Sequence, residues 1–413
     1  MEFDRYVAEH AVPLSTLDPA APFDDLEPFA ERLAAARVIA IGENAHLVPE
    51  FYLLRHRLHR FLAERLGFTV YAMESGFTEG RAVGAWVRGE RPADELRAVA
   101  DDGITYTMGR CAEMRDHLRW MRAATPPVHF FGLDVPGSTT SALPAIESIR
   151  RYLRAVDPDA APLPDRLAEL AGRYAGEHAL PVYAAYGGLD QAERDRLTAT
   201  WAELATRCDA LEPEYRAAGG DEAYAVARHE VRLALLLDQA MRGYAAAGDS
   251  PPTIHPKVAA RDRGMAETVF WLRDRFGPDA KIIVAAHNSH IQRTPVPTPA
   301  FPLSAMGHHL ATRLGEEYLA IGVTCTGGRT VTHRADPAAP GGVAIFGTDL
   351  AAPEPGSVEA ALPAKLCMVD LRPARAAGGG PDRIRIVDRY QEAPVLDAYD
   401  LMVNIPKTRA GRE

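Results

Sequence analysis

The sequence predicts an α/β fold with a mostly parallel central sheet flanked by helices and with an inserted helical subdomain. Short apolar runs that each end in a polar residue alternate with segments of helical periodicity, which is typical of a parallel sheet with helical crossovers. Residues 143–250 instead form an Ala-, Arg-, Glu- and Leu-rich stretch without such runs. We therefore predict three parts: residues 1–142 and 251–413 form the core, and residues 143–250 form a helical insertion that folds as a lid.

The first strand–helix–strand unit begins with Val38–Ile41, an apolar run of the length of a buried strand. Gly42 ends the run and lets the backbone turn. Pro49 then suits the first turn of a helix, where a missing N–H group does no harm. Thr69–Met73 forms the next apolar run. A βαβ unit of this kind predicts that the two strands are parallel neighbours.

Ionisable side chains follow both strands. Glu43 and His46 come after the first strand, and Glu74 follows the second. Each of them alone is more often a cap or a solvated loop residue. Together they lie at the carboxyl ends of parallel strands, which is the edge where α/β sheets bind ligands. A carboxylate beside an imidazole orients a general base, so the three side chains predict a site.

A second group of ionisable side chains follows later strands. Lys281–Ala286 is a strand that ends in His287 and His290, three residues apart. One such histidine alone would more often be structural, but two after a buried strand can point into one cleft. Asp134 ends the run Val128–Asp134, where it either supports the site or caps the next loop. Further strands are expected at Tyr318–Thr324, Cys367–Leu371 and Asp397–Ile405, and a hairpin or flap is expected within Gly327–Gly356.

Long helices are expected in two more regions. Thr107–Ala124 reads as one helix of the core. In the insertion, Leu143–Val156, Gln191–Ala210 and Glu222–Ala247 have helical periodicity. The insertion also carries tyrosines and histidines that could line a substrate pocket, although packing in a core with the hydroxyl satisfied is the commoner fate of tyrosine. These are His178, Tyr183, Tyr186, His229 and Tyr244.

Composition excludes several classes of protein. The chain has 413 residues, of which 47% are hydrophobic, and its formal net charge is −10. This charge disfavours nucleic-acid binding through a basic face. No apolar run approaches the roughly 18 residues of a membrane span, and no signal peptide is evident. The four cysteines form no pair motif, which predicts reduced thiols in a cytoplasmic protein. Nothing in the sequence indicates the oligomeric state.

The first unit also resembles the erythromycin esterase family of bacterial hydrolases. That family has a strand, a Gly-Glu-x-x-His turn, a helix with an arginine, and a strand that ends in glutamate. Gly42, Glu43, His46, Arg55 and Glu74 stand at these positions. The resemblance implies catalytic roles for Glu43, His46, Arg55, Glu74, His287 and His290, and supporting or substrate-binding roles for Asp134, Arg261 and Asn288. Met306-Gly307 is a further match.

The chain departs from the family at three positions, which marks it as a divergent member. Family members that hydrolyse macrolides usually have Ser or Thr before the histidine and Gly after it, whereas Ala45 and Leu47 stand here. The family commonly has Asn where this chain has Thr268. A hydroxyl is lost and a bulky apolar group is gained beside the expected base.

Two chemistries fit the predicted site. In the first, no metal or other cofactor takes part: His46 removes a proton from water, which attacks an ester, and the other histidines and Arg55 stabilise the oxyanion or protonate the leaving alkoxide. No Gly-x-Ser-x-Gly motif supports a serine nucleophile. In the second, three histidines and a carboxylate bind a divalent metal that activates water. We favour the first because the family resemblance points to general-base hydrolysis.

Other functions use the same residues. A base that deprotonates water can also deprotonate a substrate, so a biosynthetic tailoring enzyme that cyclises, eliminates or transfers an acyl group is an alternative. A binding protein without catalysis is disfavoured because all the charged residues of the pattern are present. The expected partner is a small molecule: a macrolide, a polyketide or another ester. Antibiotic resistance and natural-product biosynthesis both remain open as biological roles.

Overall fold

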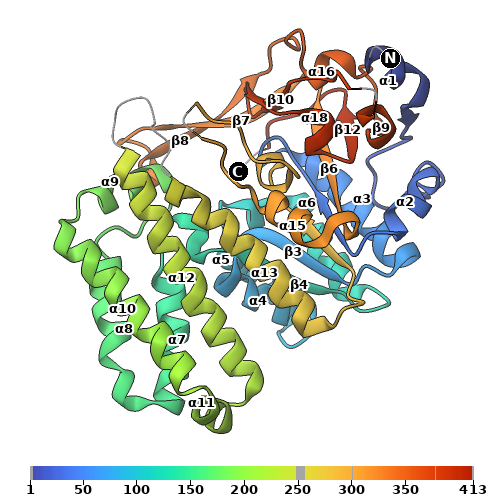
Figure 1. The fold of residues 1–413 in the computed structure, drawn as a ribbon. Helices are drawn as coiled ribbons and strands as arrows, with labels where there is room; N and C mark the ends of the chain where they lie inside the picture. Colours follow the sequence, from blue (N-terminus) through green and yellow to red (C-terminus); the bar gives the residue numbers. More distant parts are fainter. Residues whose placement is uncertain (1–2, 248–255, 300, 377, 412–413) are drawn as a thin grey trace.

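A sheet of eight strands forms the centre of the protein, with helices on both of its faces (Figure 1). The computed structural model describes residues 3–247, 256–299, 301–376 and 378–411. In the described residues the strand order is β1-β9-β12-β6-β2-β5-β3-β4. The six strands from β12 to β4 are mutually parallel, and β9 and β1 extend the sheet by antiparallel pairing. The predicted fold class, an α/β protein with a mostly parallel sheet, is therefore confirmed.

The predicted strands are present with small shifts of their ends. The last strand begins only at Leu401, because Val395–Ala398 forms the short helix α18. Three short strands, β1, β10 and β11, were not predicted. The strands are β1 Val12–Pro13, β2 Val38–Ile41, β3 Val70–Gly76, β4 His129–Asp134, β5 Ile282–Ala285, β6 Tyr318–Cys325, β7 Arg329–Ala335, β8 Val343–Asp349, β9 Cys367–Asp370, β10 Arg383–Ile386, β11 Arg389–Glu392 and β12 Leu401–Ile405.

The prediction that the first two parallel strands are neighbours is wrong. Strand β5 lies between β2 and β3, with Ala285 aligned with both Ile41 and Met73. Helix α3 (Pro49–Leu66) therefore carries the chain past one strand position, which a crossover helix can do because it packs on the face of the sheet rather than on one strand. As a result, the segment after β5 lies between the two strand ends that carry Glu43 and Glu74.

Alternate residues of the central strands enter two different hydrophobic cores. In β2, Ile39 and Ile41 join one core, whereas Val38 and Ala40 join the other. This follows from the period of two along a strand, and it explains why a strand covered on both faces reads as a continuous apolar run. Helices α3, α4 (Phe77–Val87), α5 (Leu96–Gly103) and α6 (Ala112–Ala123) contribute to the first core, and α1 (Phe3–His10), α13 (Ala260–Phe276) and α15 (Met306–Leu314) contribute to the second.

The insertion is helical, as predicted, and it has its own hydrophobic core. Two of its helices, α7 (Leu143–Val156) and α10 (Gln191–Ala210), have the predicted bounds, and α12 (Asp221–Ala247) begins one residue earlier. Three shorter helices were not predicted: α8 Pro162–Ala171, α9 Ala179–Gly187 and α11 Glu212–Gly219. Figure 1 shows α12 lying alongside α13, which joins the insertion to the core. The predicted boundary between residues 250 and 251 lies outside the described residues.

The helix predicted at Thr107–Ala124 begins only at Ala112. Tyr106 and Thr107 both have positive φ angles, 57° and 58°, so the backbone there cannot continue a right-handed helix. The hairpin predicted within Gly327–Gly356 is confirmed as β7 and β8.

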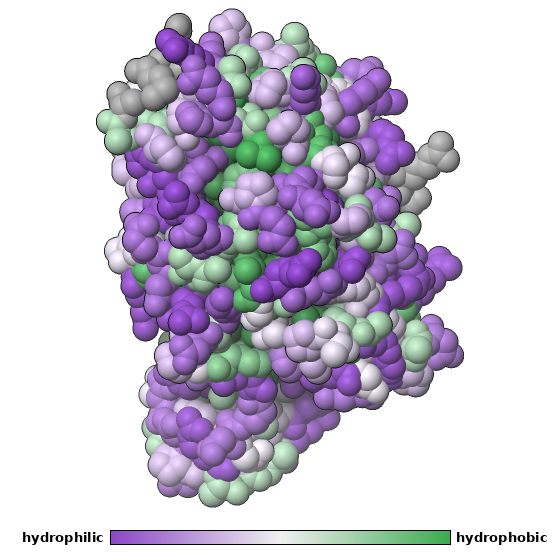
Figure 2. Space-filling view, turned by 90° about the vertical axis from the view of Figure 1, so that its right-hand side faces the viewer, coloured by the Kyte–Doolittle hydropathy of each residue, from purple (hydrophilic) through white to green (hydrophobic). Residues whose placement is uncertain are grey.

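One face of the molecule is mainly polar. Figure 2 shows a face on which hydrophilic side chains predominate and hydrophobic atoms appear mostly in the hollows between them. None of the helices in the described part of the chain is long and apolar enough to cross a membrane. All four cysteines are free thiols, and Cys208, Cys325 and Cys367 are buried.

Gly42 is required by the packing of the strand end that carries the site. A Cβ atom there would lie 2.0 Å from Oδ1 of Asn288, which accepts a hydrogen bond from the Val323 N–H group. We expect Gly42→Ala to lower the free energy of unfolding by about 1–3 kcal/mol, as overpacked cores do, in urea denaturation. Gly327→Ala is the control, because a Cβ atom there meets nothing within 4 Å. Equal stability of the two variants would contradict this account.

Candidate active site

The site lies at the carboxyl edge of the sheet, and His46 is at its centre. His46 Nδ1 lies 2.7 Å from Oε1 of Glu43, and His46 Nε2 lies 3.8 Å from Oε1 of Glu74. A carboxylate only accepts hydrogen bonds, so Nδ1 carries the proton and Nε2 is the basic nitrogen of the neutral ring. The His46 side chain is 27% exposed, whereas those of Glu43 and Glu74 are buried. The sequence had predicted all three residues.

Arg55 contacts Glu43 from α3. Its Nη2 lies 2.6 Å from Oε2 of Glu43, the oxygen that does not face His46, and the Arg55 side chain is only 1% exposed. Burial raises the pKa of Glu43, but Arg55 and His46 outweigh burial and hold this pKa below its ordinary value. Arg55 therefore keeps Glu43 charged, and Glu43 lies between it and the imidazole.

Glu74 is the most connected carboxylate of the site. One oxygen, Oε2, accepts a hydrogen bond from the His287 backbone N–H group at 2.8 Å. The other oxygen accepts one from Arg261 Nη2 at 2.8 Å and lies 3.4 Å from His290 Nε2. Burial raises the pKa of Glu74, but His290, His46 and Arg261 together hold it well below the ordinary value. Glu74 is therefore ionised over the whole range of physiological pH.

Arg261 joins Glu74 to the third strand end. Its Nη2 lies 2.6 Å from Oδ2 of Asp134, and its Nε lies 3.1 Å from Oδ1 of the same carboxylate. Asp134 is completely buried at the end of β4. This paired geometry holds the guanidinium plane in one orientation at the start of α13. Asp134 and Arg261 thus lie where a supporting role was predicted for them.

His290 has a second carboxylate partner, Asp262, which the sequence analysis missed. His290 Nδ1 donates to Oδ1 of Asp262 at 2.8 Å, and that oxygen also accepts from the Met306 N–H group at 2.8 Å. Burial lowers the pKa of His290, but Asp262 and Glu74 outweigh it and raise this pKa to about 10. His290 is therefore a cation at neutral pH. Asp262 lies next to Arg261 in sequence, and this adjacency was the one available signal for it.

His287 has protein partners at both ring nitrogens. Nε2 donates to the backbone carbonyl of Asn44 at 2.9 Å, and Nδ1 accepts from the Ser289 hydroxyl at 2.8 Å. Burial and the neighbouring His46 lower the pKa of His287 to about 4, so the ring is neutral. Asn288 is also buried, and its amide bonds to the backbone of Val323 in β6. These two residues fix the chain that follows β5.

The aromatic and histidine residues of the insertion divide into two groups. Tyr186 and His229 are buried, with hydrogen bonds to Asp238 and Thr268 respectively. Tyr183 instead donates to or accepts from the Thr139 hydroxyl at 2.9 Å, and its ring stacks on Tyr244 at 4.0 Å. Arg261 and Tyr106 influence the pKa of Tyr244, so this pair lies near the site. His178, half-buried before α9, lies close to the β7–β8 hairpin.

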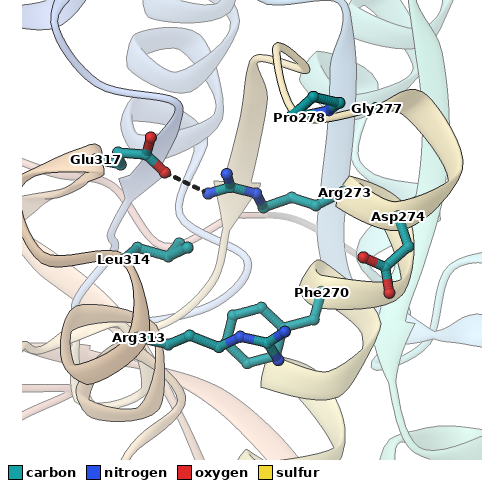
Figure 3. Close-up of a pocket in the computed structure, with 8 residues that line it drawn as sticks. All are labelled: Phe270, Arg273, Asp274, Gly277, Pro278, Arg313, Leu314 and Glu317. Carbon is teal, nitrogen blue, oxygen red and sulfur yellow. Dashed lines mark hydrogen bonds and ion pairs between the residues drawn. The ribbon is translucent and has the colours of Figure 1, made fainter.

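A hollow on another part of the surface carries no comparable group of residues. Figure 3 shows this hollow of about 480 Å³ between α13 and α15, where Arg273 forms an ion pair with Glu317 at 2.8 Å and Arg313 lies over Phe270. It contains no histidine, and it lies further along α13 than Arg261. The histidine-centred edge is therefore the better candidate site.

No group of three or more histidine, cysteine, aspartate or glutamate side chains with the arrangement of a metal site occurs among the described residues. The donor chemistry agrees with this. Glu43 and Glu74 are bonded to Arg55 and Arg261, and His287 uses both of its nitrogens within the protein.

The raised pKa of His290 makes stability depend on pH in a defined direction. The unfolded chain has an ordinary histidine pKa of about 6.5, so His290 stabilises the fold fully below that pH and loses this contribution as pH rises through about 10. We expect Asp262→Asn to lower the pKa of His290 by at least about one unit, seen by NMR titration, because the nearest carboxylate is removed. Between pH 7 and pH 10, Asp262→Asn should therefore lose less free energy of unfolding than the wild-type protein.

Asp274→Asn is the matched control, because Asp274 is exposed on the same helix. An unchanged pKa of His290 in Asp262→Asn would show that Asp262 does not set its charge.

Comparisons with known proteins show which family the chain is similar to. The sequence model of the erythromycin esterase family matches residues 63–408. The erythromycin esterase type II of Escherichia coli is 30% identical, in an alignment that covers 99% of this chain and 98% of that protein. The type I enzyme of Escherichia coli is 27% identical over 82% of each chain.

The fold has a solved relative. A mutant of the erythromycin esterase EreC in its open conformation superposes with a TM-score of 0.85, at 23% identity, over 97% of this chain and 98% of that one. This likeness concerns the fold, whereas the sequence comparisons concern ancestry. On those comparisons, the chain belongs to the erythromycin esterase family, a family of ester hydrolases.

Proposed function

We propose that this protein hydrolyses a small-molecule ester, such as a macrolactone, with His46 as the general base that activates water. The observation that carries this proposal is the hydrogen bond of 2.7 Å between His46 Nδ1 and Glu43, which leaves Nε2 as the basic nitrogen beside Glu74. The names of the Escherichia coli relatives, erythromycin esterases types I and II, support an ester substrate.

The first step is the attack of water. Nε2 of His46 takes a proton from a water molecule, and the water oxygen forms a bond to the ester carbonyl carbon. The carbonyl becomes a tetrahedral oxyanion, and His46 becomes an imidazolium. Glu43 and Glu74 stabilise this cation, because burial alone would lower the pKa of His46 whereas the two carboxylates raise it.

The second step is the loss of the alcohol. The imidazolium returns its proton to the leaving alkoxide oxygen, so that the C–O bond breaks and the acid, the alcohol and neutral His46 remain. His290 and Arg261 lie beside Glu74 and are positively charged. Their charge stabilises the oxyanion, which the carboxylates alone would repel. Arg55 and His287 do not contact the substrate in this scheme. Arg55 holds Glu43, and His287 holds the loop after β5.

The formal charges of the network favour this cycle. Four carboxylates, Glu43, Glu74, Asp134 and Asp262, face three permanent or near-permanent cations, Arg55, Arg261 and His290. The resting site therefore has one excess negative charge when His46 is neutral. Protonation of His46 in the first step neutralises this excess, so the arrangement stabilises the charge that the reaction creates.

The alternative of a biosynthetic tailoring reaction uses the same base. The departure at Leu47 supports this alternative. Family members that hydrolyse macrolides usually have Gly after the histidine, and Leu47 stands there with a φ of 61°, in the left-handed region that favours glycine. Incorporation of ¹⁸O from labelled water into the product acid distinguishes hydrolysis from cyclisation, elimination or transfer to another acceptor.

His46→Ala tests the assignment of the base. Loss of a positioned base lowers turnover by about 10²–10⁴-fold, with a modest change in KM, since the imidazole acts in the transition state. Macrolide lactones and aryl esters would be screened first for turnover by the wild-type protein. His10→Ala is the control, because His10 is exposed at the end of α1. Unchanged turnover in His46→Ala would show that His46 is not the base.

Glu43→Gln tests how the base is tuned. The basic form of His46 is required, and its pKa is raised above 6.5 through Glu74 and Glu43 against the opposing effect of burial. The rate should therefore fall on the acid side of a midpoint above pH 6.5. Removing the charge of Glu43 lowers the pKa of His46, so the acid limb of kcat/KM against pH should move to lower pH while the maximum rate drops. An acid limb that stays in place would mean that another group sets it.

A further inference from the structure

Tyr106 contacts the imidazole of His46 from one side. The two rings are stacked, with centroids 5.4 Å apart and planes inclined by only 17°. Arg261 lies 5.9 Å from the centroid of the same tyrosine ring. We propose that Tyr106 is a positioning residue that fixes the plane of the His46 imidazole, and that the turn Pro136–Thr139 anchors it. The proposal rests on the general-base role of His46.

The backbone at Tyr106 is in the left-handed region, which is strained for a residue other than glycine. Six non-glycine residues of the described chain have positive φ angles, and five of them lie in the Tyr106 segment, in the turn Pro136–Thr139 or directly after His46. Such conformations persist where the surrounding structure enforces them, and they cluster at functional sites. The five are Leu47, Tyr106, Thr107, Ser138 and Thr139, and the sixth is Val387.

The tyrosine hydroxyl connects this strained segment to the turn after β4. Tyr106 donates to the backbone carbonyl of Ser138 at 2.7 Å, and the hydroxyl groups of Thr105 and Ser138 are 2.7 Å apart. The turn is held in its own place by Glu79 of α4, which accepts from the Gly137 N–H group at 2.7 Å. Tyr106 is thus fixed at its hydroxyl end as well as through its backbone.

The need for such a contact follows from how His46 is otherwise held. The hydrogen bond from Nδ1 to Glu43 fixes one atom of the ring but leaves the ring free to tilt about that bond. His287 approaches the imidazole edge-on, with centroids 5.8 Å apart and an angle of 64°. Tyr106 covers a face, so the stacked ring removes the remaining tilt and keeps Nε2 directed toward Glu74.

Tyr106→Asn removes the ring while keeping a residue that tolerates a left-handed backbone. The readout is the NMR signal of the His46 Nδ1–H proton, which needs no substrate. We expect this signal to broaden and to exchange faster with water in Tyr106→Asn, because the ring tilts out of its bond to Glu43. Tyr106→Phe keeps the stacked ring and should restore the signal. Tyr106→Gly serves as a second ring-free variant if the first does not fold.

Tyr6→Asn is a matched control at the opposite edge of the sheet, where Asp370 pairs with the first residue of β12. Tyr6 also donates its hydroxyl to a backbone carbonyl, that of Asp370, at 2.7 Å, and its ring lies 4.5 Å from that of His10. Loss of Tyr6 therefore removes comparable contacts without touching the site. A His46 signal that is as sharp in folded Tyr106→Asn as in Tyr6→Asn would overturn the proposal.

Kinetics separate positioning from general damage. With an ester substrate, Tyr106→Asn should lower kcat by about 10- to 100-fold at nearly constant KM, as misplaced catalytic groups do, and Tyr106→Phe should recover most of this loss. Equal loss in Tyr106→Asn and Tyr106→Phe would contradict a role of the ring. If no ester is turned over but the NMR signal changes as expected, the proposed esterase function fails while the positioning of His46 by Tyr106 stands.

Discussion

The buried carboxylate of Glu74 is the interaction on which the site depends. It lies at the end of β3 and contacts groups from three other segments: His46 after β2, His287 and His290 after β5, and Arg261 at the start of α13. A buried carboxylate is costly unless it is paired and hydrogen-bonded. Without it, the buried cations Arg261 and His290 would each keep only one carboxylate partner, Asp134 and Asp262 respectively. Glu74 therefore holds together strand ends that the chain connects only over long distances.

The three histidines have similar surroundings in sequence but different charges in the structure. Each follows a buried parallel strand, yet the pKa of His290 is raised to about 10 and that of His287 is lowered to about 4. Burial lowers the pKa of both rings; at His290 the carboxylates of Asp262 and Glu74 outweigh it, whereas His287 donates to a backbone carbonyl and lies beside His46. Burial lowers the pKa of His46 as well, but Glu74 and Glu43 outweigh it and raise this pKa. Groups whose pKa values are pushed apart can take different roles in one acid–base cycle.

The strand-end residues of the candidate site could be predicted from the sequence because strand ends are visible as apolar runs that stop at a polar residue, whereas Arg55 and Arg261 came only from the family resemblance. The strand order could not, because a crossover helix leaves no sign of how many strand positions it passes, so β5 was not expected between β2 and β3. Asp262 was missed for a related reason: in a helix with mixed polarity, an aspartate reads as a solvated residue until its neighbours in space are known. Tyr106 was missed because its left-handed backbone is enforced by tertiary contacts, and no glycine marks it.

Leu47 is a second residue whose left-handed backbone is imposed by tertiary contacts. Its φ of 61° gives the loop after His46 a form that glycine would adopt without strain, so the surrounding contacts impose the form. One such contact is the hydrogen bond from the Gly411 N–H group to the Leu47 carbonyl at 2.9 Å. With the backbone held in this way, the side chain takes a fixed place in a narrow crevice with Val331 and Ile345 of the β7–β8 hairpin. The β7–β8 hairpin therefore packs against the residue that follows the proposed base.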